Sequence, residues 1–230
     1  MDIEFRDLGL LSYKDAWDLQ EKLLQENVVL KTKARLDGIA DPFQVATRQY
    51  LLFVEHPHVY TLGKSGDISN VLISEQEMQQ NGISFFHTNR GGDITYHGPG
   101  QLVGYPILDL EKHYTDIGRY LRNLEELIIK VMAHYGLKGE RSAGETGVWL
   151  DPSIKGKERK ICAMGVRCSR WITMHGFAFN VNVDLHYFRN IVPCGIQDKQ
   201  VTSLEKELGH RVDMNEVKNL VLKNFKEIFN

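Results

Sequence analysis

Cys194 has a sequence setting that suits nucleophilic chemistry. It lies in the segment Ile191-Val-Pro-Cys-Gly-Ile, directly after a proline and before a glycine. The proline restricts the approach of the chain, and the glycine lets a backbone N–H come close to whatever the sulfur holds. A thiolate attacks a thioester carbon readily and also leaves readily, so a cysteine suits the exchange of an acyl group between thiols. The alternative is that Cys194 is a small buried apolar residue, as many free cysteines are.

Lys160 is the candidate group for moving a proton. It belongs to Arg159-Lys-Ile-Cys-Ala-Met-Gly-Val-Arg, where a strand of small and apolar residues begins. A lysine at the edge of such a strand can be partly desolvated, which lowers its pKa and allows proton exchange near neutrality. The alternative is an ordinary solvated charge, because lysines and an arginine cluster over residues 155–160.

The segment from Arg90 to Gln101 combines glycines with polar side chains. It reads Arg-Gly-Gly-Asp-Ile-Thr-Tyr-His-Gly-Pro-Gly-Gln. Glycines permit tight turns and close approach of a ligand, and the polar groups surround that space. A hairpin turn alone explains three of the glycines but not the polar and aromatic side chains beside them. This density favours a binding loop.

A second candidate for binding is the strand-like segment 174–182. Its residues Gly176, Ala178 and Asn180 share one face, and small side chains on one face leave a groove in which an acyl chain can lie. Ordinary packing of this face against a helix explains the same pattern.

Common catalytic motifs are absent from the sequence. It contains no G-x-S-x-G and no H-E-x-x-H. Gly63-Lys-Ser lacks the upstream glycine of a phosphate-binding loop, and Val103 occupies the third glycine position of a dinucleotide fingerprint. No histidines have metal-ligand spacing, and His56 and His58 flank a proline in a predicted turn. The sequence therefore predicts neither a metal nor a cofactor.

The elements that must position these residues alternate without a strict βαβ rhythm. We expect a strand over 2–10, a helix capped by Ser12 through about 36, a strand over 50–54, a short helix with the capping box Ser74 and Glu77, a loop over 89–104, a strand over 102–110, a helix from Thr115 to Gly136, strands between 146 and 184 and a helix over 213–230. The alternation over 177–184 predicts a half-buried strand. The fold class is thus α/β (α+β), a mixed, mostly antiparallel sheet flanked by helices.

Length and composition favour one soluble domain. No linker divides residues 1–230, and the net charge of −2 does not favour nucleic-acid binding. Three cysteines without a C-x-x-C pair fit a reducing compartment. No apolar run is long enough to cross a membrane, and the first residues do not read as a signal peptide. We expect a cytoplasmic protein, although a trimmed organellar protein has the same features, and a monomer, since no coiled-coil seam is visible.

Several segments together, spanning about residues 50–205, resemble the lipoyl (octanoyl) transferases. The family pattern Arg-Gly-Gly-x-x-Thr-Tyr-His-x-x-Gly-Gln-x-x-x-Tyr is met from Arg90 to Tyr105. Gly147-Val-Trp, the Lys160 segment, His175-Gly-Phe-Ala-Phe-Asn and Pro193-Cys-Gly follow in the family's order. One departure is Met164, where a branched aliphatic residue is expected, and this puts the preferred acyl length in doubt.

The resemblance implies a fold similar to the biotin and lipoate protein ligases, without their use of ATP. It implies that Cys194 forms an acyl-enzyme thioester, that Lys160 handles the protons, and that His97 lies beside the reacting carbonyl. The implied acyl site consists of Arg90, Gly91, Gly92, Asp93, Ile94, Thr95, Tyr96, His97, Ala163, Met164, Gly165, Gly176, Phe177 and Ala178. The implied donor is octanoyl-acyl carrier protein. The implied acceptors are lipoyl domains of 2-oxoacid dehydrogenase complexes and the glycine cleavage H protein.

Such partners are expected to be acidic, so a basic surface near the site would speed encounter. The candidate residues, which are equally explained as solvated faces, are Lys155, Lys157, Arg159, Arg167, Arg170, Arg119 and Arg122.

Two other functions fit parts of the same pattern. An ATP-dependent lipoate or biotin ligase shares the glycine-rich loop and a lysine but does not need Cys194. A non-catalytic protein that binds an acyl chain forms no covalent adduct. Only the resemblance brings Cys194 and Lys160 together, because they are distant along the chain.

Overall fold

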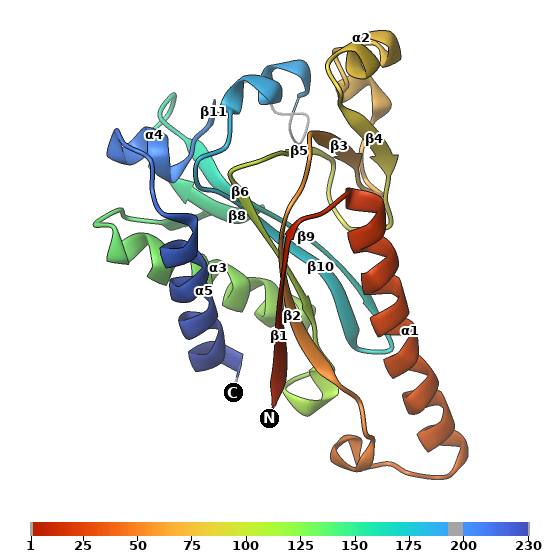
Figure 1. The fold of residues 1–230 in the computed structure, drawn as a ribbon. Coiled ribbons are helices and arrows are strands. Elements are labelled where there is room, and N and C mark those ends of the chain that lie inside the picture. The colour runs from red at the N-terminus through yellow and green to blue at the C-terminus, as the bar shows by residue number, and fades with distance from the viewer. Residues whose placement is uncertain (1, 193–199, 230) are drawn as a thin grey trace.

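The computed structural model describes residues 2–192 and 200–229, and a large twisted sheet runs through the middle of it (Figure 1). The strand order is β1-β2-β6-β10-β9-β8-β7, with β11 beside β9, and a smaller sheet has the order β4-β3-β5. The strands are β1 (Ile3–Leu10), β2 (Gln49–Glu55), β3 (Val59–Leu62), β4 (Ser84–His87), β5 (Ile94–His97), β6 (Gln101–Ile107), β7 (Glu140–Ser142), β8 (Glu145–Leu150), β9 (Arg159–Ser169), β10 (Ile172–Asn180) and β11 (Gln200–Val201). In the larger sheet only β1 with β2 and β11 with β9 pair in parallel. The predicted mixed, mostly antiparallel sheet is therefore confirmed.

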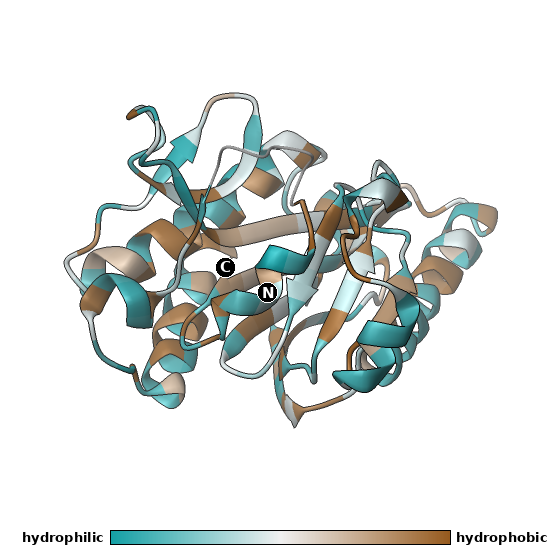
Figure 2. Ribbon diagram, turned by 90° about the horizontal axis from the view of Figure 1, so that it is seen from above, coloured by the Kyte–Doolittle hydropathy of each residue, from teal (hydrophilic) through white to brown (hydrophobic). Residues whose placement is uncertain are grey.

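Helices cover both faces of the larger sheet. They are α1 (Tyr13–Leu36), α2 (Glu75–Gln80), α3 (Ile117–His134), α4 (Leu204–Leu208) and α5 (Met214–Phe229), with short 3-10 turns at Pro42–Gln44, Ile68–Asn70, Leu110–Lys112 and Leu185–Asn190. Helix α1 lies on one face, and α3 and α5 lie together on the other (Figure 1). Apolar and polar segments alternate along these helices (Figure 2), as expected for helices with one face on a core. In the described residues no helix meets the length and apolarity that crossing a bilayer requires.

Local sequence signals set the helix starts. The Ser12 side chain accepts a hydrogen bond from the Asp15 N–H at the start of α1, and Ser74 and Glu77 form the complete capping box of α2. The predicted start of α3 at Thr115 is wrong by two residues, because the helix begins at Ile117. The cap is Asp116, whose carboxylate accepts from the Arg119 N–H. These caps satisfy backbone donors that have no partner inside the helix.

Strand β10 is buried on both faces, so the prediction of a half-buried strand is wrong. Phe177 and Phe179 pack into the cluster under α3 and α5. Met174 and Ala178, on the opposite face, pack into the cluster under α1. Helices on both faces remove the solvent-exposed side that the alternating pattern predicted.

The predicted loop over residues 89–104 contains a strand. Strand β5 pairs with β3 in the smaller sheet, and β6 then starts at Gln101. Strand β6 also ends earlier than predicted, at Ile107. Gly104 lets β6 lie against β10, because a Cβ there would stand 2.1 Å from Cζ of Phe177. The small residue therefore creates space for a cross-strand ring.

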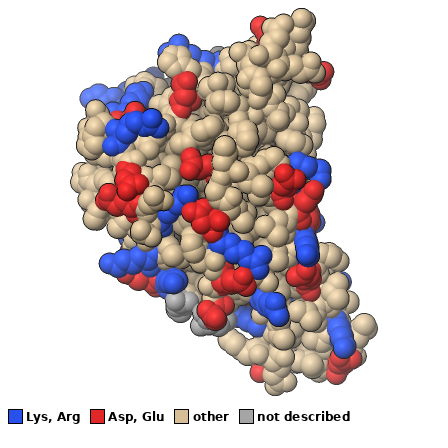
Figure 3. All heavy atoms as spheres, in the orientation of Figure 1, with Lys and Arg blue, Asp and Glu red and all other residues tan. Residues whose placement is uncertain are grey.

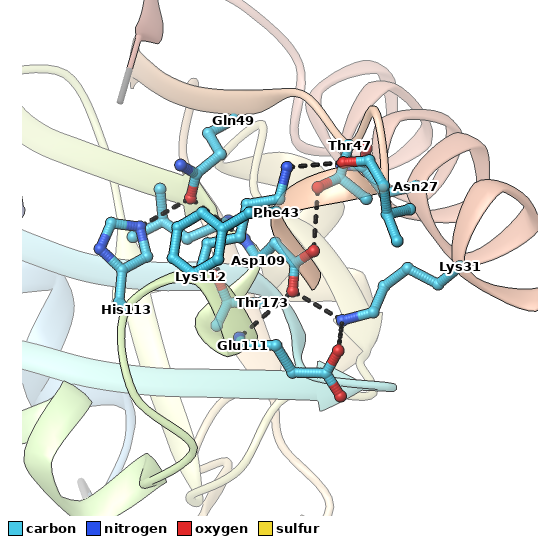
Figure 4. Close-up of polar contacts among 12 residues, drawn as sticks. Asn27, Lys31, Phe43, Thr47, Gln49, Asp109, Glu111, Lys112, His113 and Thr173 are labelled. Atoms are coloured by element: carbon cyan, nitrogen blue, oxygen red, sulfur yellow. Dashed lines mark hydrogen bonds and ion pairs between the residues drawn. The ribbon is translucent and has the colours of Figure 1, made fainter. Parts of the chain in front are cut away.

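A buried ion pair ties the end of β6 to α1 (Figure 4). The Lys31 ammonium lies 2.6 Å from Oδ1 of Asp109 and 2.8 Å from Oε2 of Glu111. Thr47 donates to the other oxygen of Asp109 at 2.9 Å, and Asn27 exchanges two hydrogen bonds with the Arg48 backbone. These contacts fix the long loop after α1 against the sheet.

Candidate active site

A cavity of about 580 Å³ lies where the two sheets meet, and it collects the chemically distinctive residues of the chain. Its lining includes the predicted residues Arg90, Gly91, Gly92, Asp93, Ile94, Thr95, His97, Lys160, Ala163, Met164, Gly165, Gly176, Phe177 and Ala178. Val103, Ile117 and Leu121 add apolar surface. The lining residues extend from Tyr13 to Val201, so segments up to 188 positions apart in the sequence share one space, which is the arrangement of a ligand site.

Among the described residues of the predicted site, Tyr96 is the one that does not line this cavity. Its ring stacks on Tyr187 at 5.0 Å between centroids, and its hydroxyl lies 2.6 Å from Nδ1 of His58. Adjacent residues of a strand point to opposite faces, so Tyr96 and His97 face different sides of β5. The ring therefore packs β5 against the turn at 185–190.

Arg90 holds the glycine-rich segment in place. Its buried guanidinium donates to the Thr61 carbonyl at 2.6 Å, the Thr61 hydroxyl at 2.9 Å and the Asp93 carbonyl at 2.8 Å. A Cβ at Gly63 would stand 2.2 Å from the Gly92 carbonyl oxygen, so this turn requires glycine. The arginine thus has a structural part in shaping the wall and also places a positive charge beside the cavity.

The histidines at the cavity are held neutral. Burial, followed by the charges of Arg90 and Arg167, lowers the pKa of His175 to about 3. Burial also lowers the pKa of His97 well below its usual range, with further contributions from His56 and Arg90. Behind the wall, burial lowers the pKa of His56 to about 4. Near neutral pH these rings therefore act as hydrogen-bonding groups and not as cations.

Lys160 extends into the cavity from β9. Its ammonium lies 4.5 Å from the centre of the Trp149 ring, a cation–π contact that orients the side chain. The backbone of Lys160 pairs with Trp149 of β8 on one side and Val201 of β11 on the other. This position between two strands fixes where the amine stands.

The two described cysteines do not suit nucleophilic attack. Burial raises the pKa of both the Cys162 thiol and the Cys168 thiol. Thiolates are the reactive form, so both side chains are poor nucleophiles near neutral pH.

The predicted nucleophile Cys194 lies outside the described residues, as do the rest of residues 193–199. The described residues Phe188 and Val201, on either side of that segment in the sequence, both line the cavity.

Three polar aromatic residues of the cavity, Tyr13, Tyr105 and His175, are among the lining residues that the predicted site did not include. Tyr13 begins α1 and its ring stacks on His97 at 5.9 Å. Tyr105 donates its hydroxyl to Nε2 of His56, whose other ring nitrogen donates to the Leu11 carbonyl. Tyr105 and His175 were visible within the family motifs, whereas no local signal marked Tyr13.

Three of the seven residues of the expected basic surface are paired with carboxylates. Arg159 pairs with Asp151 and Glu207, Arg167 pairs with Glu21, and Arg122 pairs with Glu125. The face in Figure 3 shows Lys and Arg interspersed with Asp and Glu. These arginines therefore add little to long-range attraction.

Comparisons with known proteins agree with this arrangement. The family model for the lipoyl protein ligase A/B catalytic domain matches residues 12–226. An octanoyltransferase of Christiangramia forsetii is 59% identical over 99% of this chain and 96% of its own length, and one of Flavobacterium johnsoniae is 58% identical over the same shares. Among solved structures, a putative lipoate protein ligase from T. acidophilum superposes with a TM-score of 0.68 at 17% identity, covering 99% of this chain and 85% of that one. A biotin protein ligase from Aquifex aeolicus has a TM-score of 0.51 at 15% identity, covering 99% and 68%.

Proposed function

The chain belongs to the family of lipoyl protein ligase A/B catalytic domains, and from this membership we propose the reaction of its cavity. It is an octanoyltransferase, an acyltransferase like its full-length relatives. We propose that it takes octanoyl from octanoyl-acyl carrier protein, holds it as a thioester on Cys194 and passes it to a lysine of a lipoyl domain. The acceptors proposed are those of 2-oxoacid dehydrogenase complexes and the glycine cleavage H protein.

One observation carries the proposal: Lys160 shares a single, partly apolar cavity with the glycine-rich segment and with β10. The apolar lining suits an acyl chain, and Lys160 places an amine in the same space. Both described thiols are held protonated by burial, which leaves Cys194 as the cysteine suited to form the thioester.

In the first half-reaction, the amine form of Lys160 takes the thiol proton of Cys194. The resulting thiolate attacks the carrier thioester carbon, and the bond from that carbon to the carrier sulfur breaks. Lys160 then returns the proton to the departing carrier thiolate. The products are an octanoyl-Cys194 thioester and the free carrier thiol.

In the second half-reaction, an acceptor lysine attacks the enzyme thioester. Lys160 removes a proton from the attacking amine, an amide bond forms, and the Cys194 sulfur leaves and regains a proton. Amide formation from a thioester is downhill, so the sequence of steps consumes no nucleotide. Two partners bind in turn, which makes the mechanism ping-pong.

The test is to incubate the protein with octanoyl-acyl carrier protein in the absence of ATP and to record the intact mass. We expect the addition of one octanoyl group, mapped to Cys194 and removed by hydroxylamine. Cys194→Ala should lose the adduct, whereas Cys168→Ala, which changes another thiol of the chain, should keep it. A stable adduct on Cys194→Ala would refute the nucleophile. Transfer of free octanoate that requires ATP and survives alkylation of Cys194 would indicate a ligase instead.

A further inference from the structure

A continuous chain of buried hydrogen bonds runs along the wall of the cavity. We call it the polar chain, and its members are Arg90, Thr61, His97, Gln101, Asn180 and Thr202. All six are buried. It begins beside β3 in the smaller sheet, passes through β5, β6 and β10 and ends just after β11.

The Thr202 end fixes the direction of every bond. The Thr202 carbonyl can only accept, so the Asn180 group 3.0 Å from it is the amide nitrogen, and the Asn180 oxygen faces Gln101. That oxygen and the Tyr96 carbonyl both face one group of Gln101, at 2.9 and 3.1 Å, which must be its nitrogen. The Gln101 oxygen is therefore left facing Nδ1 of His97, at 2.8 Å. Nδ1 must carry a hydrogen.

The contacts at the Arg90 end are compatible with this assignment. A guanidinium can only donate, so the Thr61 hydroxyl oxygen accepts from Arg90 at 2.9 Å. The single hydroxyl hydrogen of Thr61 is then free to point at Nε2 of His97, 3.3 Å away. Because Nδ1 carries the hydrogen and the buried ring is neutral, Nε2 is the bare nitrogen and accepts from this hydroxyl. The two ends together define one neutral tautomer of His97, with both ring nitrogens engaged.

The far end of the polar chain reaches the strand that flanks Lys160. The Thr202 N–H donates to the Lys160 carbonyl at 2.9 Å, and Val201 pairs with Lys160 in parallel. Strand β11 has only two residues, so it has few ladder bonds of its own. The bond from Asn180, at the end of β10, to the Thr202 carbonyl therefore adds an attachment directly after β11.

We propose that Gln101 and Asn180 are positioning residues of the acyl transfer. Gln101 fixes the tautomer of His97 at one end of the polar chain, and Asn180 fixes the position of β11 beside Lys160 at the other. This inference rests on the proposed function. It also restricts the role of His97: with both ring nitrogens engaged, the ring is a fixed part of the wall, and Lys160 carries the proton of the reaction.

Replacement Asn180→Asp tests the β11 end. Aspartate keeps an oxygen for Gln101 but cannot donate to the Thr202 carbonyl when ionised. We expect kcat for octanoyl transfer to fall about tenfold and KM for the acyl-carrier protein to change less than kcat, because the change acts mainly on the position of Lys160.

Asn27→Asp is the matched control. Asn27 is equally buried, donates to the Arg48 carbonyl at 2.7 Å and accepts from the Arg48 N–H at 2.9 Å, far along α1 from the cavity. It should lose comparable thermal stability and keep its kcat per folded molecule. Equal kcat in the two variants would refute the positioning role of Asn180.

The His97 end is tested without substrate by nitrogen NMR of protein labelled with ¹⁵N-histidine. We expect His97, assigned with His97→Asn, to show a protonated Nδ1 and a bare Nε2. In Gln101→Glu the carboxylate beside Nδ1 should favour the doubly protonated ring, so its signals should move towards imidazolium at a higher pH than in wild type. The opposite tautomer in the wild type would overturn the inference. Because this readout needs no acyl donor, it remains valid if octanoyl fails to appear on Cys194, an outcome that would count against the proposed function alone.

Discussion

Acidification should destabilise this protein through two buried histidines, one lining the cavity and one behind it. Burial is the main cause that lowers the pKa of His56 from 6.5 to about 4 and that of His175 from 6.5 to about 3. Between those values the unfolded chain binds protons that the folded chain does not. The free energy of unfolding is therefore undiminished by these two rings above pH 6.5 and decreases as the pH falls below 6.5.

The size of the effect follows from linkage. Between about pH 7.5 and about pH 5, each ring contributes a loss of about 2 kcal/mol, or about 4 kcal/mol for the pair. That is a large fraction of the roughly 5–15 kcal/mol that stabilises an ordinary domain.

Urea unfolding followed by tryptophan fluorescence at both pH values measures this loss. His56→Gln removes one titrating ring, so its free energy of unfolding should change by about 2 kcal/mol less between the two pH values than that of the wild type. His210→Gln changes an exposed ring and serves as the control. A wild-type loss under about 1 kcal/mol, or an unchanged pH dependence in His56→Gln, would show that these rings are not held neutral by burial.

Two further substitutions probe the support of the site. Lys31→Met removes the cation from the buried carboxylate of Asp109. We expect the free energy of unfolding, measured with urea, to fall by about 3 kcal/mol, and the acylation rate per folded molecule to stay unchanged. A fall of less than about 1 kcal/mol would contradict a buried ion pair. Gly165→Ala places a Cβ 2.7 Å from the Gly91 carbonyl oxygen, so the cavity wall must shift. We expect acylation of the enzyme, measured by intact mass against time, to slow about tenfold. Its control is Gly118→Ala, where the added carbon would stand 3.2 Å from one side-chain oxygen, Oδ1 of Asp116. Equal acylation rates in the two variants would argue against a tight wall.

Features set by neighbours in the sequence were predictable. The capping box of α2 and the start of α1 depend on residues three positions apart, and the structure has both as expected. Strand β5 was missed because its four residues lie between glycines and its partner β3 lies 32 to 38 positions upstream. A short strand exists only if its partner is there to accept its hydrogen bonds, which no local pattern reveals.

The sequence by itself determined the chemical groups and the class of fold. Residue types and spacing indicate Lys160, the glycine-rich segment and the mixed sheet, because side-chain chemistry and local backbone preferences are properties of the sequence. Only the tertiary structure decided which groups share a space, which rings are neutral and which way the bonds around His97 point. Those properties depend on burial and on partners brought from distant strands, and both arise when the sheets come together.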